Sequence, residues 1–181
     1  MATGVKTKIL DRKAYSRSVS EVFGTRQAFV KVGVFGNEGE TPHKADDGAA
    51  QTLTLVALAT IHEFGLGVPQ RSFVRAYVDA NVDRIQRMLF VLMQGAVRNA
   101  LRNGAPITDA DRTRILSLVG IKMVGEMQER ISAGISPALA ESTLRKKTVG
   151  GKVGTTPLIE TGQLRSSIGF AVSLDGKWGG Q

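Results

Sequence analysis

Two long stretches in the middle of the chain carry apolar residues at helical spacing. The first runs from Ser72 to Asn103, and Gly104 follows it where a helix would end. Steps of three and four residues place its apolar positions on one stripe, which predicts a single long amphipathic helix. The stripe consists of Val74, Val78, Val82, Ile85, Leu89, Leu92 and Ala96.

The second stretch predicts a helix that begins at Thr108 or Asp109, either of which can cap it, and continues to about Ala133. A short turn containing Gly and Pro separates the two, so we expect them to pack as an antiparallel helical hairpin. We expect Gly120 and Gly125 to let a neighbouring helix approach closely. The apolar positions recur every fourth residue, at Ile115, Val119, Met123, Met127 and Ile131.

The part of the chain before these helices predicts a helix and a strand. Asp11 is a candidate N-cap for a helix that extends to about Phe23, and Gly24 would end it. From Arg26 to Phe35 every second residue on one face is a valine, which is typical of a strand. These valines are Val30, Val32 and Val34.

A further helix is predicted immediately before the first long one. Gln51 to Phe64 is nearly continuously apolar with helical spacing, and Gly65 lies where a C-cap glycine belongs. A buried strand from Leu53 to Leu58 remains the alternative for this stretch. The polar, glycine-rich and acidic segment 37–48 is interpreted as a mobile loop.

The last part of the chain completes the predicted fold. The basic, glycine-rich segment 144–156 is interpreted as an exposed arm, and Thr161 as the N-cap of a single helical turn. Alternation from Ser167 to Leu174 predicts a final strand. The whole pattern predicts one α+β domain over residues 1–181, in which a small antiparallel sheet packs against long helices including the helical hairpin.

Composition narrows the classes of protein to which the chain can belong. Its 181 residues are 42% hydrophobic and 22% charged, as expected of a globular domain. The absence of cysteine excludes disulfides, thiolate metal sites and cysteine nucleophiles. No apolar run approaches the roughly 20 residues of a membrane span, and the start lacks the apolar core of a signal peptide. We therefore expect a soluble protein with no membrane partner.

The charge is strongly positive, because 24 lysines and arginines face 16 acids for a net charge of +8. An excess of this size suggests nucleic acid or an acidic protein surface as a partner. Aromatic residues make up only 6% and do not interleave with the basic runs, which argues against stacking on single strands. The candidate contacts to nucleic acid or to a partner are Arg145, Lys146, Lys147 and Lys152. Further basic residues are Lys6, Lys8, Arg12, Lys13 and Arg17, and, in the long helix, Arg75, Arg84, Arg87, Arg98 and Arg102.

Motifs for catalysis or metal binding are not found. His62 lacks the second histidine four residues on that a zinc-protease helix needs, so we interpret it as a capping or packing residue. His43, Asp46 and Asp47 lack the spacing of a calcium-binding loop. The glycine-rich run 150–155 lacks the four-residue gap of a phosphate loop. The sequence predicts a protein that is not an enzyme, with no cofactor and no metal.

Two motifs about 90 residues apart add information that composition does not. The first is His-Glu-Phe-Gly at 62–65, followed by Val-Pro-Gln-Arg-Ser-Phe-Val-Arg at 68–75. The second is Pro-Leu-Ile-Glu-Thr-Gly-Gln-Leu-Arg-Ser-Ser-Ile at 157–168. Together they resemble tailed-bacteriophage neck and tail-completion proteins, which include Mu-like virion morphogenesis proteins and minor tail components. Val68 stands where that family usually has Ile, Val74 where it has Leu, and Ser72 where Pro is common.

The resemblance implies a structural virion protein that forms a ring at the head-proximal end of the tail and joins tail to head. Rings of tail components are usually six-fold and head-side connectors twelve-fold, and a six-fold homo-oligomer is favoured here. The implied partners are the tail terminator, the head-tail connector or stopper, the tail tube and, non-specifically, packaged DNA. The implied location is the virion neck or tail, with assembly in the host cytoplasm. A tail terminator ring that stops tube growth and a DNA-binding accessory protein remain as alternatives.

We expect the motif residues to act mainly through folding and assembly. Gly65 would permit a positive φ, Pro69 would stiffen the turn, and Phe73 would pack the start of the long helix against the sheet. Arg71 and Arg75 would lie on one side of that helix, free to meet a carboxylate. In the second motif, Thr161 would cap the short helix, Gly162 would allow a tight turn into it, and Leu164 and Ile168 would face the core. The full set is His62, Glu63, Phe64, Gly65, Pro69, Arg71, Phe73, Arg75, Pro157, Leu158, Thr161, Gly162, Leu164, Arg165, Ser167 and Ile168.

Overall fold

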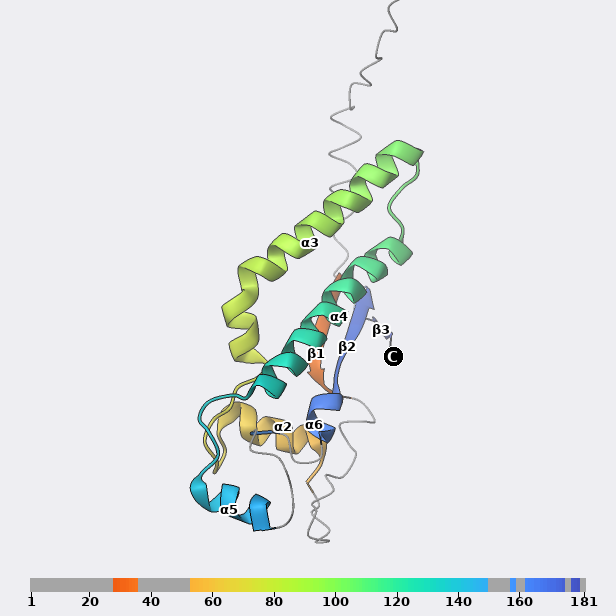
Figure 1. The fold of residues 1–181 in the computed structure, drawn as a ribbon. Coiled ribbons are helices and arrows are strands. Elements are labelled where there is room, and N and C mark those ends of the chain that lie inside the picture. The colour runs from red at the N-terminus through yellow and green to blue at the C-terminus, as the bar shows by residue number, and fades with distance from the viewer. Residues whose placement is uncertain (1–27, 36–52, 150–156, 159–161, 175–176, 180–181) are drawn as a thin grey trace, which may run out of the picture.

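The computed structural model describes residues 28–35, 53–149, 157–158, 162–174 and 177–179. Within them a three-stranded sheet packs against long helices, which confirms the predicted α+β fold (Figure 1). The elements in chain order are β1 (Ala28–Val34), α2 (Leu55–Phe64), α3 (Arg75–Asn103), α4 (Asp109–Ala133), α5 (Glu141–Val149), α6 (Gln163–Ser166), β2 (Ile168–Leu174) and β3 (Lys177–Gly179).

The sheet joins strands from opposite ends of the chain. β1 pairs antiparallel with β2, from Ala28 opposite Leu174 to Val34 opposite Ile168, and the short β3 follows β2 on the other side. Both predicted strands are therefore confirmed, and β2 begins one residue later than expected. β2 lies in the centre of the sheet, and α4 packs on both β2 and β1.

The antiparallel helical hairpin is confirmed. α3 ends at Gly104, which has a left-handed conformation at φ 65°, and α4 begins after the N-cap Thr108. The Thr108 and Asp111 side chains cap each other's backbone N–H groups, which satisfies donors at the start of α4. α4 packs on β1 and β2 and also against α3, so the layers run sheet, α4, α3 (Figure 1).

The buried face of α4 agrees with the predicted pattern, whereas that of α3 agrees only in part. All five predicted α4 positions, from Ile115 to Ile131, are buried. On α3 the buried residues are Tyr77, Met93 and Val97, none of which belongs to the predicted stripe, and Val82 is 44% exposed. The difference has a simple cause, because α3 is the outer layer of the hairpin and most of its predicted stripe is only half-buried.

A polar cluster holds the two helices together near the start of α3. The Tyr77 hydroxyl donates to Glu126 Oε2 at 2.6 Å, Arg84 forms an ion pair with the same carboxylate, and Lys122 Nζ lies 3.1 Å from Oε1. The hydrogen bonds from Arg84 chiefly lower the pKa of Glu126 to about 2. Burial and the neighbouring carboxylate raise the pKa of Tyr77 to about 12. Glu126 is therefore charged and Tyr77 neutral at physiological pH.

The expectation that both glycines of α4 face a helix is wrong. A Cβ atom added at Gly120 would lie 2.5 Å from Cδ2 of Phe170, so this glycine allows α4 to approach the sheet strand β2. A Cβ atom at Gly125 would meet nothing within 4 Å. The close approach therefore occurs once, between helix and sheet.

Two further expectations can be compared with the described residues. The stretch before Gly65 is a helix capped by Thr54, whose side chain accepts from the Ala57 N–H at 3.2 Å, so the alternative strand 53–58 is wrong. The first part of the predicted arm is helical, because it belongs to α5, which extends to Val149. An i,i+4 ion pair between Glu141 and Arg145 supports this helix.

The predicted helix 11–23, the loop 37–48 and residues 150–156 lie outside the described residues. Among the described helices, none combines the length and apolar character needed to cross a membrane.

Gly120→Ala should destabilise the fold, while Gly125→Ala should not. Alanine favours a helix over glycine by up to about 1 kcal/mol, and at Gly125 the added methyl has open space. At Gly120 it would overlap Phe170, and overpacking typically costs about 1–3 kcal/mol. Urea unfolding of both variants would measure the difference. Equal free energies of unfolding would contradict the close packing of α4 on β2.

Candidate functional site

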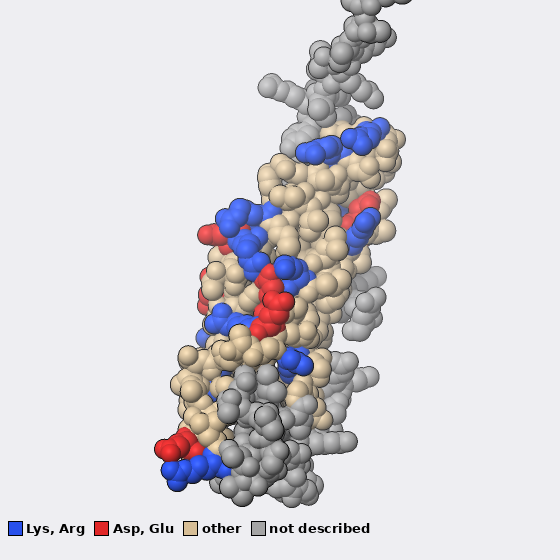
Figure 2. Space-filling model, viewed as in Figure 1, with Lys and Arg blue, Asp and Glu red and all other residues tan. Residues whose placement is uncertain are grey.

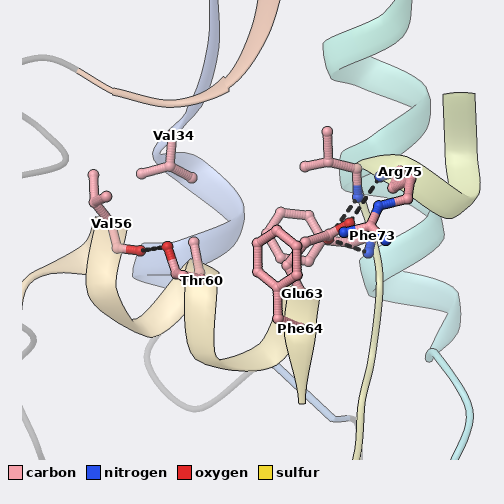
Figure 3. Close-up of a pocket in the computed structure, with 9 residues that line it drawn as sticks. Val34, Val56, Thr60, Glu63, Phe64, Phe73 and Arg75 are labelled. Carbon is pink, nitrogen blue, oxygen red and sulfur yellow. Dashed lines mark hydrogen bonds between the residues drawn. The ribbon is translucent and has the colours of Figure 1, made fainter. Parts of the chain in front are cut away.

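The carboxylate of Glu63, at the end of α2, lies at the start of α3 and accepts four hydrogen bonds there. Figure 3 draws Glu63 beside the first residues of α3. The donors are the Ser72 hydroxyl at 2.6 Å and the backbone N–H groups of Phe73, Val74 and Arg75 at 2.9, 3.1 and 2.9 Å. The first N–H groups of a helix lack partners within the helix, and their partial positive charge favours an anion. Glu63 therefore caps α3 from another helix.

The environment of Glu63 keeps it charged although only 8% of its surface is exposed. Burial alone would raise the pKa of this carboxyl, but the hydrogen bonds from Ser72 and the three backbone N–H groups outweigh that effect. The pKa of Glu63 consequently lies below its usual value of 4.5. The Ser72 hydroxyl also accepts from the Ala76 N–H at 3.0 Å, so it joins the carboxylate to the first turn of α3.

A tight reversal of the chain brings Glu63 to α3. Gly65 has the left-handed conformation at φ 71° and ψ 38°, as predicted, and its N–H donates to the Ile61 carbonyl. The Arg71 N–H donates to the His62 carbonyl at 2.9 Å, and Gln70 Nε2 donates to the Glu63 carbonyl at 3.0 Å. These bonds close the turn, and the capping or packing role of the His62 side chain stays a prediction.

Arg71 connects this turn to the segment that follows α4. Only 5% of Arg71 is exposed, and its Nε and Nη2 donate to the carbonyl oxygens of Pro137 and Ala138 at 2.8 and 3.1 Å. The expectation that Arg71 lies on α3 and awaits a carboxylate is therefore wrong. Arg75 does lie on α3 and is exposed, with its guanidinium carbon 4.8 Å from the centre of the Phe64 ring.

The second motif forms the short helix α6 and the start of β2. Its N-cap is Gly162, with φ 74° and no side-chain cap, so the prediction that Thr161 caps this helix is wrong; Thr161 itself lies outside the described residues. Leu164 and Ile168 are each 3% exposed, which confirms that both face the core. The buried Ser167 hydroxyl donates to the Leu164 carbonyl at 2.9 Å.

Polar contacts also connect α6 to the end of α4. Gln128 Nε2 donates to the Arg165 carbonyl at 3.2 Å, and Arg165 Nη1 donates to the Ser132 hydroxyl at 3.0 Å. Before α6, Pro157 is buried and Leu158 has a positive φ of 65°. The second motif is thus held by both its apolar and its polar side chains.

The two motifs converge on one hydrophobic cluster. Phe73 from the first motif and Leu164 and Ile168 from the second belong to the same buried core, and Leu158 packs against it. α2 also contacts α6 directly. Segments about 90 residues apart in the sequence therefore build one structural unit at one end of the hairpin, which we call the motif unit.

An apolar pocket of about 300 Å³ opens in the motif unit between β1, α2 and the start of α3 (Figure 3). Its size is at the low end for small-molecule sites. The Glu63 oxygens at its wall are already occupied by the hydrogen bonds to α3, so the pocket suits an apolar side chain better than a reacting group. The lining residues are Val34, Val56, Ala59, Thr60, Glu63, Phe64, Phe73, Val74 and Arg75.

The predicted basic contacts that the structure describes lie on α5. Arg145 lies on α5 and pairs with Glu141 at 2.7 Å, and Lys146 and Lys147 belong to the same helix. Lys152 lies outside the described residues. Pro69 and Phe64 lie in the motif unit but are exposed. Among the described residues no group of three or more His, Asp or Glu is placed to hold a metal ion.

Comparison with known proteins gives no relative of this chain. A scan against protein-family models found no match, and searches of curated proteins and of solved structures found none either. The resemblance to phage neck and tail-completion proteins therefore remains a prediction from the two motifs.

Glu63→Gln should destabilise the protein at neutral pH and have less effect in acid. The lost charge-assisted hydrogen bonds should cost about 1–3 kcal/mol. Because the pKa of Glu63 is lower in the folded state, its contribution is full above about pH 4.5 and is lost as pH falls through the folded pKa. Urea unfolding at pH 7 and at pH 3 measures this. Glu129→Gln, which alters an exposed carboxylate of α4, is the control; a Glu63→Gln effect independent of pH would contradict the capping role.

Gly65→Ala should destabilise the protein much more than Gly67→Ala. Both glycines have positive φ, 71° and 74°, so both substitutions add backbone strain of about 1–2 kcal/mol. At Gly65 the new Cβ would also lie 2.9 Å from Gln70 Cβ, whereas at Gly67 it would meet nothing within 4 Å. Thermal unfolding of the two variants separates strain from overlap. Similar melting temperatures would show that the turn is looser than the structure indicates.

Proposed function

We propose that this chain is a structural subunit of a tailed-bacteriophage virion, forming a ring at the head-proximal end of the tail and joining tail to head. The observation that carries the proposal is the convergence of the two motifs. Phe73, Leu164 and Ile168 share one core, so the resemblance concerns a physical unit rather than two unrelated short matches.

The contacts of the motif residues support a structural role. Glu63 uses its carboxylate to cap α3, and Arg71 uses its guanidinium to hold the segment after α4. Gly65 and Gly162 both have positive φ and serve turns. Side chains with such intramolecular contacts stabilise the fold of the subunit, which agrees with a structural role in a ring.

Exposed apolar side chains on both helices of the hairpin support assembly with other subunits. Phe90 and Val91 on α3 are 54% and 64% exposed, and Leu118 and Ile121 on α4 are 44% and 57% exposed. A closed ring requires two different surfaces on each subunit, since every contact is head-to-tail. We assign the exposed apolar residues of the two helices to such surfaces.

Electron microscopy of a phage that lacks this gene tests the proposal. We expect filled heads and tails of normal length that remain unjoined, because the joining ring is missing. Supplying the gene from a plasmid should restore joined virions. Overlong tails would favour the terminator alternative instead, and intact virions would contradict both. Duplex binding that weakens with salt and on neutralising Lys146 and Lys147 would favour the DNA-binding alternative.

A further inference from the structure

A second, polar groove of about 660 Å³ lies between the first turns of α3 and the end of α4. It is separate from the apolar pocket of the motif unit, although Arg75 contributes to the lining of both. The ionisable residues that line it are Arg75 and Asp79 from α3 and Arg130 from α4, and Gln70 and Ser72 add polar side chains.

Arg130 lines this groove and carries a buried donor without an acceptor among the described residues. Its Nε is buried and finds no hydrogen-bond acceptor among the described residues. Leaving a buried donor of a charged group without an acceptor costs free energy, so such groups are normally paired. The ion pairs among the described residues do not involve Arg130. A ligand in the groove does not reach this buried Nε, so Arg130 contributes to the groove through the positive charge of its guanidinium, which is unpaired within the part of the chain that the structure describes.

Arg75 makes the groove more positive. Its guanidinium lies over the Phe64 ring, and no ion pair within the described part of the chain involves it. Two arginines thus face a single acid, Asp79, in the lining. A guanidinium binds a carboxylate through two parallel hydrogen bonds, so this arrangement suits a carboxylate ligand.

We propose that this groove binds the carboxylates of an acidic polypeptide segment, and that segment 37–48 of a second copy of the chain is that segment. In the sequence, 37–48 contains four of the sixteen acids and one lysine, a net charge of −3 with histidine neutral. The chain as a whole has a net charge of +8, so two copies repel each other unless an acidic part of one faces a basic part of the other. The four acids are Glu38, Glu40, Asp46 and Asp47.

The surroundings of the groove favour a peptide over nucleic acid. Asp79 lies in the lining itself, and Asp83 follows it one turn later on α3. Figure 2 shows acidic and basic residues side by side over the middle of this face rather than a continuous basic stripe. A phosphate backbone would meet repulsion from several acids there, whereas one or two carboxylate side chains would meet two arginines and the single acid Asp79 of the lining.

The inference rests on the homo-oligomer of the proposed function but not on its place in a virion. The test uses the full-length chain with its own segment neutralised (E38Q, E40Q, D46N and D47N), so that the groove is free. A synthetic peptide of residues 37–48 is titrated into it by calorimetry at low salt. We expect saturable binding that Arg130→Gln weakens about tenfold or more.

Matched variants make the result specific. Arg98→Gln removes an equal charge from the exposed far end of α3 and should leave peptide binding unchanged. Asp79→Asn removes the repelling acid and should strengthen binding. A peptide with Gln and Asn in place of its four acids should not bind. Equal binding of that neutral peptide, or no binding of the acidic one, would overturn the proposal. It would also be overturned if Arg130→Gln weakened binding of duplex DNA but not binding of the peptide.

Sedimentation velocity tests the second copy. At equal concentration the wild-type chain should associate more than the neutralised chain and the Arg130→Gln variant. Unchanged association in both variants would overturn the assignment to a second copy, while peptide binding could still occur. If the groove does not bind the acidic peptide, the phenotype expected for the phage that lacks this gene is unaffected. The two proposals can therefore fail separately.

Discussion

The arrangement of α2 and α3 depends on one buried carboxylate, that of Glu63. A charge with 8% exposure is stable only with several partners, and here the partners are Ser72 and the first three N–H groups around the start of α3. The same bonds satisfy donors that a helix start leaves open. The Glu63 carboxylate and the N–H groups at the start of α3 satisfy each other. The turn at Gly65, which positions the carboxylate, and the direction of α3 therefore depend on each other.

The direction of α3 in turn determines the rest of the packing. It places Phe73 in the core beside Leu164 and Ile168, and it brings Tyr77 to Glu126 on α4. α4 then lies between α3 and the sheet at a distance that Gly120 permits. The core of the hairpin and the motif unit are therefore one continuous body, with Arg71 closing it to the segment after α4.

Features with local signals were predicted well from the sequence. The four-residue repeat of α4, the cap at Thr108 and the end of α3 at Gly104 depend only on residues nearby, and all were confirmed. The roles of Glu63 and Arg71 were missed, because their partners lie 9–12 and 66–67 residues away and meet them only after the chain reverses. No spacing in the sequence distinguishes such residues from a solvent-exposed glutamate and arginine.

Some residues of the motif unit stabilise its fold, and others have exposed surface that a partner can contact. The side chains of Glu63 and Arg71 make contacts within the protein that stabilise the motif unit, so these residues contribute to its shape. Partner choice must then come from residues outside these contacts. The exposed apolar residues such as Phe90 and Ile121, and the groove with the unsatisfied Arg130, are the described features with surface to offer. Ser72 and Arg75 belong to the first motif and also line the groove, so shape and recognition overlap there. Chains that share the motifs can still differ in what they bind through residues outside them, such as Arg130, Phe90 and Ile121.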